Sequence, residues 1–274
     1  MKPLVKTGRL FYGTGVVAYG IQQLIIRDFR PEILSPFPAW GHQYIFPILT
    51  GLAMIVGGII ISGLFTFRKK NTKTVCLYLG FYFLVLIILS HLPYILIFSP
   101  NKASHLGVWA EVLKCLAYCG GAFVMAGSFA DNNFTGSKKS VSGSWLKKMI
   151  PFGRIFFSTT MIVYGCCHFV YIEYINHMVP GWFGMPVFWT YFGGVALIAS
   201  GLAIVFKIWI KPVGLLLAAM LFLWFIFLHV PDAIANPRLN NGNEVVSAFD
   251  ALLFCGIALV IALTNGPDKL SLAE

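Results

Sequence analysis

The sequence is poor in charge. Of its 274 residues only 11% are Asp, Glu, Lys or Arg, whereas 58% are hydrophobic, and the mean hydropathy is +0.80. A soluble domain carries roughly 25% charged residues, so this chain has too little charge to cover a water-facing surface. The composition therefore excludes an ordinary soluble domain and predicts a membrane protein.

Motifs of several enzyme classes are also absent. The sequence has no phosphate-binding Gly-x-x-x-x-Gly-Lys-Ser/Thr, no dinucleotide-binding Gly-x-Gly-x-x-Gly, no His-Glu-x-x-His and no Gly-x-Ser-x-Gly. There is no Cys-x-x-Cys, and none of the six cysteines falls in a predicted outer loop, where a structural disulfide is expected. Catalytic residues are therefore unknown, and whether the chain is an enzyme stays open.

What is present is a series of apolar runs of about 20 residues, long enough to cross a hydrocarbon core of about 30 Å as helices. Backbone groups in lipid must be satisfied within the segment, so each run is predicted to be helical. The predicted spans lie near 9–27, 44–67, 74–98, 107–130, 152–172, 187–209, 212–230 and 245–264. The fold class expected is all-α, a polytopic membrane protein with eight transmembrane helices.

Basic residues follow alternate loops rather than one stripe. One side collects Lys and Arg near residues 2–9, 68–73, 138–154, 207–211 and 269, and the other side has few, diluted by acidic residues. The positive-inside rule makes the basic side cytoplasmic and places both termini there. The net charge of +10 is thus accounted for by topology, and a nucleic-acid partner is not expected.

The two halves of the chain resemble each other. Agreements in order, with small gaps, pair Gly8-Arg9 with Gly153-Arg154, Tyr19-Gly20 with Tyr164-Gly165, Gly51 and Gly58 with Gly194 and Gly201, His91-Leu92-Pro93 with His229-Val230-Pro231, and Cys119-Gly120 with Cys255-Gly256. The pattern predicts two four-helix repeats, residues 1–130 and 150–274, joined by a basic cytoplasmic linker, 131–149. An even number of spans in each makes the repeats parallel, related by a pseudo-twofold axis along the membrane normal. Within the linker, Ser144 to Lys148 is either a short interfacial helix or part of a disordered hinge.

All six histidines are predicted in the outer half of the membrane or in outer loops. His91 and His229 stand out because each precedes a proline by two residues, and proline frees carbonyls in the preceding turn. Near the pseudo-axis the two could face one another, and they are the ligands to expect if a metal binds. A polar mouth formed by these histidines at the outer side would suit a quinone head group or a heme edge, although histidine is also simply tolerated at membrane interfaces. The candidate ligand-binding residues are His91, His229, His168 and its counterpart Gln23 in the first repeat. Trp40 and Trp182, predicted in the belt of aromatic residues at the outer membrane interface, are also candidates.

Strong charges occur deep within only two predicted spans. Lys114 and Asp250 are equivalent positions in the two repeats and could pair across the axis, offsetting a burial cost of about 2.5 to 3.5 kcal/mol each. Glu111, three residues before Lys114 on one helix, is a second candidate partner. The group is either a structural ion pair or part of a proton or ligand site.

A family resemblance follows from the second repeat. The strings Tyr164-Gly165-Cys166-Cys167-His168-Phe169, Val179-Pro180-Gly181-Trp182, Tyr191 to Ala196, and Leu228 to Pro237 with His-x-Pro and Ala-Asn-Pro resemble the DoxX family of small four-helix membrane proteins. The first repeat resembles it through His91-Leu92-Pro93 and Trp109 to Gly121. Leu197 and Met54 stand where many members carry a glutamate.

The resemblance implies a bacterial inner-membrane, multi-pass protein that serves as an accessory in envelope redox chemistry. Relatives include a subunit of a thiosulfate:quinone oxidoreductase, maturation proteins, and eukaryotic receptors or chaperones, so the fold does not choose among activities. Besides the bilayer, a membrane or periplasmic protein is an expected partner. The leading hypothesis is binding of a quinone or another apolar ligand between the repeats; the alternatives are a non-enzymatic scaffold or chaperone and a small-solute transporter.

Overall fold

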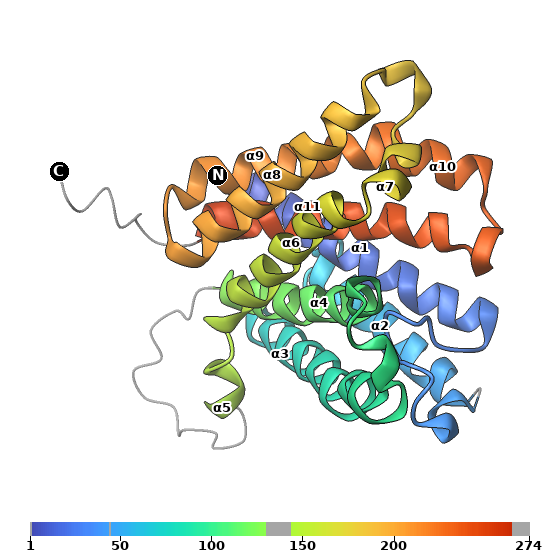
Figure 1. Cartoon of the computed structure of the whole chain (residues 1–274). Coiled ribbons are helices and arrows are strands. Elements are labelled where there is room, and N and C mark those ends of the chain that lie inside the picture. The colour runs from blue at the N-terminus through green and yellow to red at the C-terminus, as the bar shows by residue number, and fades with distance from the viewer. Residues whose placement is uncertain (1, 44, 130–143, 265–274) are drawn as a thin grey trace.

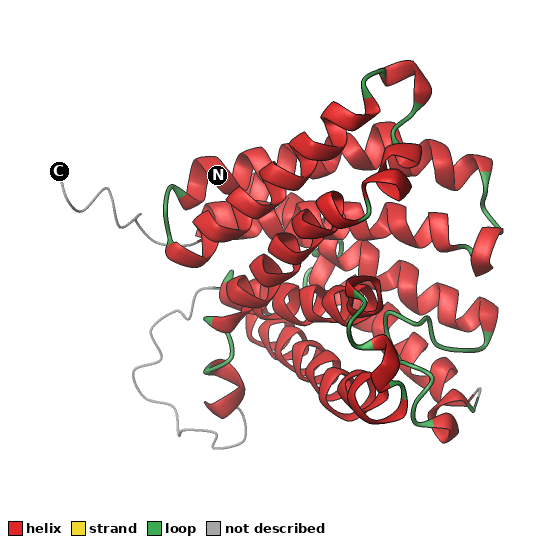
Figure 2. Cartoon of the chain, viewed as in Figure 1, coloured by secondary structure: helices red, strands yellow, loops and turns green. Residues whose placement is uncertain are grey.

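The computed structural model describes residues 2–43, 45–129 and 144–264, and in these ranges it is helical with no strand (Figure 2). The α-helices are α1 Lys2–Ile26, α2 Ile45–Ser62, α3 Lys69–Leu86, α4 Trp109–Gly127, α5 Ser144–Lys147, α6 Phe152–Val170, α7 Ile172–Met178, α8 Pro186–Phe206, α9 Ile210–Trp224, α10 Val230–Ala235 and α11 Asn243–Thr264. Each apolar run singled out in the sequence contains an α-helix. The all-α prediction is confirmed for these residues.

The membrane character of the chain rests on the length and apolarity of its helices. Six described segments qualify as candidate spans: Ile45–Ser62, Lys69–Phe98, Leu106–Gly127, Pro186–Phe206, Ile210–Ala235 and Asn243–Thr264. A seventh is added if α6 and α7, bent by 100° at Tyr171, count as one broken span. Helix α1 is 25 residues long but carries polar side chains such as Arg9, Gln22 and Gln23, which lower its hydropathy. The number of candidates is thus smaller than the eight spans predicted.

The helices form a single bundle in which the start of α1 and the end of α11 lie at one end, here named the terminal end (Figure 1). The opposite end, the distal end, holds the connections 27–44 and 236–242. Helix α1 packs on α2 and α11, α4 packs on α3 and α6, α8 packs on α6, and α9 packs on α11. Helices α4 and α11 are the most buried candidate spans, which makes them the centre of the bundle.

Two glycine pairs allow helices of different halves to approach closely. A Cβ atom on Gly256 of α11 would lie 2.5 Å from the carbonyl oxygen of Gly8 in α1, and one on Gly120 of α4 would lie 2.6 Å from that of Gly153 in α6. Real Cβ atoms essentially never come so close. Only glycine therefore permits these two backbone contacts, as in close helix pairs within membranes.

The distal ends of two long helices contain wide turns. A π-helical turn, Ile87–His91, extends α3, and a second, Phe225–His229, extends α9; Pro93 and Pro231 follow two residues later. Proline has no backbone N–H, so the regular i→i−4 ladder cannot pass through it. These turns lie where the sequence predicts that the prolines free carbonyls of the preceding helix.

The connection between α1 and α2 folds back into the bundle. Its buried side chains are Phe29, Arg30, Glu32, Ile33, Leu34 and Ser35. It therefore covers the distal end of the first half and brings two charges into the interior. Of the predicted linker 131–149, residues 131–143 lie outside the described residues, and the remainder begins with the short helix α5, whose Trp145 contacts Phe81 of α3 edge to face at 5.1 Å.

Candidate functional site

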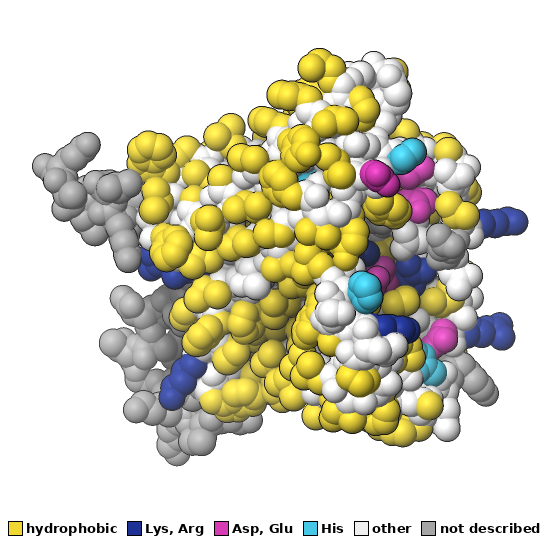
Figure 3. Space-filling model, in the orientation of Figure 1, with side chains coloured by type: hydrophobic (Ala, Val, Ile, Leu, Met, Phe, Trp, Pro, Cys, Tyr) yellow, Lys and Arg dark blue, Asp and Glu magenta, His cyan; other side chains and the backbone are white. Residues whose placement is uncertain are grey.

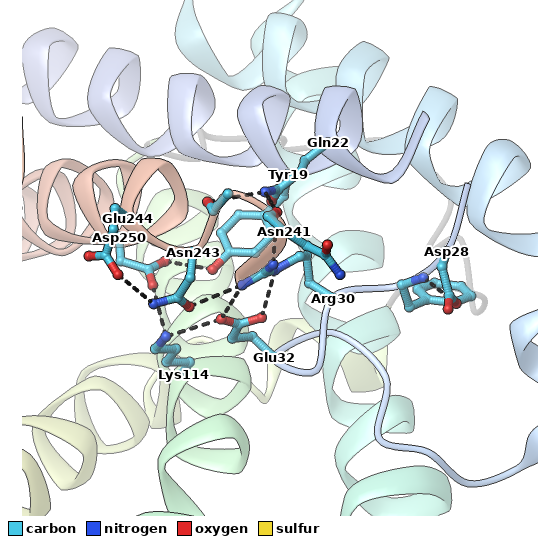
Figure 4. A network of polar contacts seen from close by, with 12 residues as sticks. Tyr19, Gln22, Asp28, Arg30, Glu32, Lys114, Asn241, Asn243, Glu244 and Asp250 are labelled. Carbon is cyan, nitrogen blue, oxygen red and sulfur yellow. Dashed lines mark hydrogen bonds and ion pairs between the residues drawn. The ribbon is translucent and has the colours of Figure 1, made fainter. Parts of the chain in front are cut away.

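A buried ion cluster lies where α4, α11 and the 27–44 connection meet (Figure 4). The ammonium nitrogen of Lys114 on α4 is 3.1 Å from Glu32 Oε1 and 3.5 Å from Asp250 Oδ2 on α11. The side chains of Glu32 and Asp250 are 2% and 7% exposed, and that of Lys114 is 17% exposed. The structure thus brings Lys114 and Asp250 together across the two halves, with Glu32 as an additional partner.

Arg30 ties the connection to the start of α11. Its Nε is 3.3 Å from Glu32 Oε2, while its two terminal nitrogens donate to the Asn241 carbonyl at 3.2 Å and to Asn243 Oδ1 at 3.1 Å. Burial raises the pKa of the Glu32 carboxyl, but the positive charges of Lys114 and Arg30 together lower it by more than burial raises it. The resulting pKa lies below the ordinary value of 4.5. Glu32 is therefore held in its charged form.

Two tyrosines hold the carboxylate of α11. The hydroxyls of Tyr19 on α1 and Tyr118 on α4 donate to Asp250 Oδ1 at 2.8 and 2.6 Å, and they also contact each other. Tyr118 in turn is tethered by Tyr12, whose hydroxyl donates to its carbonyl at 2.7 Å. Charge-assisted hydrogen bonds of this kind stabilise an ionised carboxylate in a dry environment. Asp250 of the second half is thus held by groups of the first half.

Glu111 behaves differently from the expectation of a second Lys114 partner. No ion pair joins the two side chains in the described chain, because the Lys114 ammonium turns to Glu32 and Asp250 instead. Glu111 is half-buried, and its Oε2 atom is buried without a hydrogen-bond partner among the described residues. Glu111 is therefore the carboxyl group of the cluster that no ion pair of the described residues holds.

The two histidines before the prolines do not meet. His91 is 2% exposed, and its Nε2 lies 3.3 Å from the carbonyl oxygen of Ile33 in the 27–44 connection. His229 is half-buried at the end of the turn that extends α9. Over residues 2–43, 45–129 and 144–264 no hydrogen bond or ring contact joins the two imidazoles. The expected facing pair is not formed in this arrangement.

The remaining candidates lie apart from the ion cluster. His168 Nδ1 is 2.8 Å from the Tyr164 carbonyl, and its ring stacks on Trp224 with centroids 5.9 Å apart. Gln23 is fully buried and donates to the Pro47 carbonyl at 3.1 Å. Both therefore have packing and hydrogen-bonding partners within the protein.

The belt residues face outward, since Trp40 is 64% and Trp182 68% exposed. Acidic and histidine side chains gather at the same distal end of the molecule (Figure 3). Among the residues that the structure describes, no group of three or more His, Cys, Asp or Glu side chains could hold a metal ion, and all six cysteines are free.

A groove opens beside the cluster. It has a volume of about 600 Å³ and lies between α1 and α11, with Pro237, Arg238, Asn241 and Gly242 lining its distal end. Its lining is mostly apolar and consists of Ala18, Tyr19, Ile21, Gln22, Ile25, Ile26, Pro237, Arg238, Asn241, Gly242, Val245, Val246 and Phe249. Tyr19 lines the groove and also donates to Asp250, so this side chain connects the groove to the ion cluster.

Sequence reasoning missed Arg30, Glu32, Tyr19 and Tyr118. The charge pattern predicts Arg30 and Glu32 in an outer loop, where charge is normally solvated. A signal was available for Tyr19, because Tyr19-Gly20 recurs as Tyr164-Gly165 in the second half.

Comparison with known proteins gave no match: no family model, no curated protein and no solved structure is significantly similar to the chain.

Proposed function

We propose that the chain is an eight-span membrane protein made of two parallel DoxX-like four-helix repeats, and that it binds a quinone or a similar apolar ligand between them. The contacts between halves support the duplication. Under the sequence alignment Gly8 corresponds to Gly153 and Gly256 to Gly120, so the close contact of α1 with α11 and that of α6 with α4 are equivalent. Both contacts join one half to the other. This is the pattern that a pseudo-twofold axis produces.

Equivalent local features support the same arrangement. The packing of α1 on α2 corresponds to that of α6 on α8, and the π-helical turns at His91 and His229 occupy equivalent positions. The bend between α6 and α7 has no described counterpart in α1, so the two halves differ at that point.

The distribution of charge supports the orientation. The basic residues at the helix ends near 2–9, 68–73, 147–154 and 207–211 lie at the terminal end, whereas the described acidic residues belong to the distal half. By the positive-inside rule the terminal end is cytoplasmic and the distal end faces outward. We place the protein in a bacterial inner membrane, with both termini in the cytoplasm.

The single observation that carries the ligand proposal is the groove between α1 and α11. It lies between the halves near the distal end, its volume of about 600 Å³ falls in the range of small-molecule sites, and its walls are apolar. A polar head group placed there would meet Tyr19 and Gln22, and Gln22 Oε1 is buried without a hydrogen-bond partner among the described residues. An apolar molecule with a hydrogen-bonding head suits these walls. The accessory role in redox chemistry comes from the family resemblance.

Filling the groove tests this proposal. Purified wild-type protein is extracted with organic solvent and the co-purified quinone is measured by mass spectrometry, with phospholipid measured in the same extract. Ala18→Phe places a ring in the groove and is expected to remove the quinone. Ala53→Phe makes the same change in a smaller apolar hollow of about 380 Å³ between α2 and α3 and is the matched control.

Three outcomes would contradict quinone binding. Wild-type protein free of quinone would refute it, as would equal quinone in the two variants. Phospholipid, and not quinone, lost specifically on Ala18→Phe would show that the groove holds a lipid chain. A ligand-free protein that keeps a stable membrane partner in pull-downs would favour the scaffold instead.

A further inference from the structure

The ion cluster has an excess of negative groups. It contains two cations, Arg30 and Lys114, and three carboxyl groups, Glu32, Glu111 and Asp250. A net charge buried between helices in a membrane is expensive unless it is compensated. The excess would be removed by one proton on one of the three carboxyl groups.

The hydrogen bonds distinguish the three groups. Glu32 lies beside both Arg30 and Lys114. Asp250, which is buried, accepts from two tyrosine hydroxyls at Oδ1 and lies 3.5 Å from Lys114 at Oδ2. Glu111 Oε2 and Asp250 Oδ2 both lack a hydrogen-bond partner among the described residues, but Asp250 Oδ2 has the Lys114 ammonium beside it. Glu32 and Asp250 are thus ion-paired, and Glu111 is not.

The groups facing Glu111 come from every neighbouring element. Lys114 is on its own helix, Arg30 and Glu32 are on the 27–44 connection, Asp250 is on α11, and Tyr164 of α6 donates to the carbonyl of the adjacent Ala110 at 3.0 Å. His229, at the end of the turn that extends α9, lies within electrostatic range of Lys114. Since both cations already contact other carboxylates, no ion pair of the described residues involves Glu111.

We propose that Glu111 is a proton-binding site between the two halves, occupied at neutral pH. An unpaired ionised carboxylate costs far more to bury than the neutral acid, and protonation also makes the cluster electrically neutral. Lys114 lies three residues away on the same helix face, so its ammonium is within reach of Glu111 if the proton leaves. Release of the proton would then draw Lys114 from Glu32 and Asp250 and loosen the contact between the halves. This site goes beyond the ligand proposal and does not depend on the groove.

Infrared spectroscopy tests the assignment directly. Protein in nanodiscs is expected to show at neutral pH the carbonyl stretch of a protonated carboxylic acid, which disappears as the pH is raised. Glu111→Gln should lose this band completely. Glu244→Gln is the matched control, because Glu244 is a half-buried glutamate at the start of α11 whose Oε1 accepts from Asn243 at 3.3 Å.

Isotope labelling gives the same answer without a variant. In wild-type protein the band should shift with ¹³C-labelled glutamate and stay in place with ¹³C-labelled aspartate. A band that moves only with aspartate would assign the proton to Asp250 and overturn the proposal. So would the absence of any band at neutral pH, or its loss in Glu244→Gln but not in Glu111→Gln.

Discussion

Removing the Lys114 charge should destabilise the protein strongly. At 3.1 and 3.5 Å from Glu32 and Asp250, the ammonium attracts each carboxylate by about 5 kcal/mol at an effective dielectric constant of about 20. Desolvation offsets part of this attraction, and removing one partner of a buried pair costs about 3–5 kcal/mol. Because Lys114 is 17% exposed, we expect Lys114→Met to cost about 3 kcal/mol, near the lower limit.

For a chain of this size, a loss of about 3 kcal/mol corresponds to a fall of about 6–12 °C in Tm. Thermal unfolding in one detergent, followed by fluorescence, measures it. Lys211→Met, at an exposed lysine of α9, is the control and should change Tm by less than about 2 °C. If Lys114→Met melts within error of Lys211→Met, the cluster does not hold the halves together.

Two further predictions concern other groups of the same interface. The folded protein lowers the pKa of Glu32, so the ion pairs of Glu32 stabilise the fold above pH 4.5. This stabilisation is lost as the pH falls through the lower pKa of the folded protein. Glu32→Gln should therefore melt at a lower temperature than wild type at pH 7, and the difference in Tm should shrink on acidification. A difference in Tm that stays constant on acidification would contradict this. Gly256→Ala forces a Cβ to within 2.5 Å of the Gly8 carbonyl oxygen and should cost about 1–3 kcal/mol, whereas Gly57→Ala, whose Cβ would meet only Val75 at 3.6 Å, should be neutral in the same melting assay.

The helices could be predicted from the sequence because their signal is local. Apolar runs of membrane length specify helix, and the glycines and His-x-Pro strings repeat visibly. The pairing of Lys114 with Asp250 was also accessible, because alignment of the halves makes the two positions equivalent and their charges are opposite. The distance between the two charged groups could not be predicted from the sequence.

The rest of the site depends on tertiary packing. Nothing local shows that Arg30 and Glu32, in a proline-rich connection, fold inward to less than 10% exposure. Their burial follows from the shape of the bundle at its distal end. The bend at Tyr171 was missed for a related reason, since the apolar pattern of α6 continues across it. The isolation of Glu111 likewise arises from the direction that Lys114 takes, which spacing on one helix does not determine.

The central claim is that both halves enter the membrane in the same direction, with the ion cluster near the outer face. Single cysteines introduced at Lys102 and Arg238 report the distal end, and those at Lys70 and Lys211 report the terminal end. In intact cells a membrane-impermeant maleimide should label the first two variants and leave the last two unlabelled until the cells are opened, with wild-type protein as the background. Labelling of Lys102→Cys and Arg238→Cys from opposite sides of the membrane would contradict the parallel arrangement.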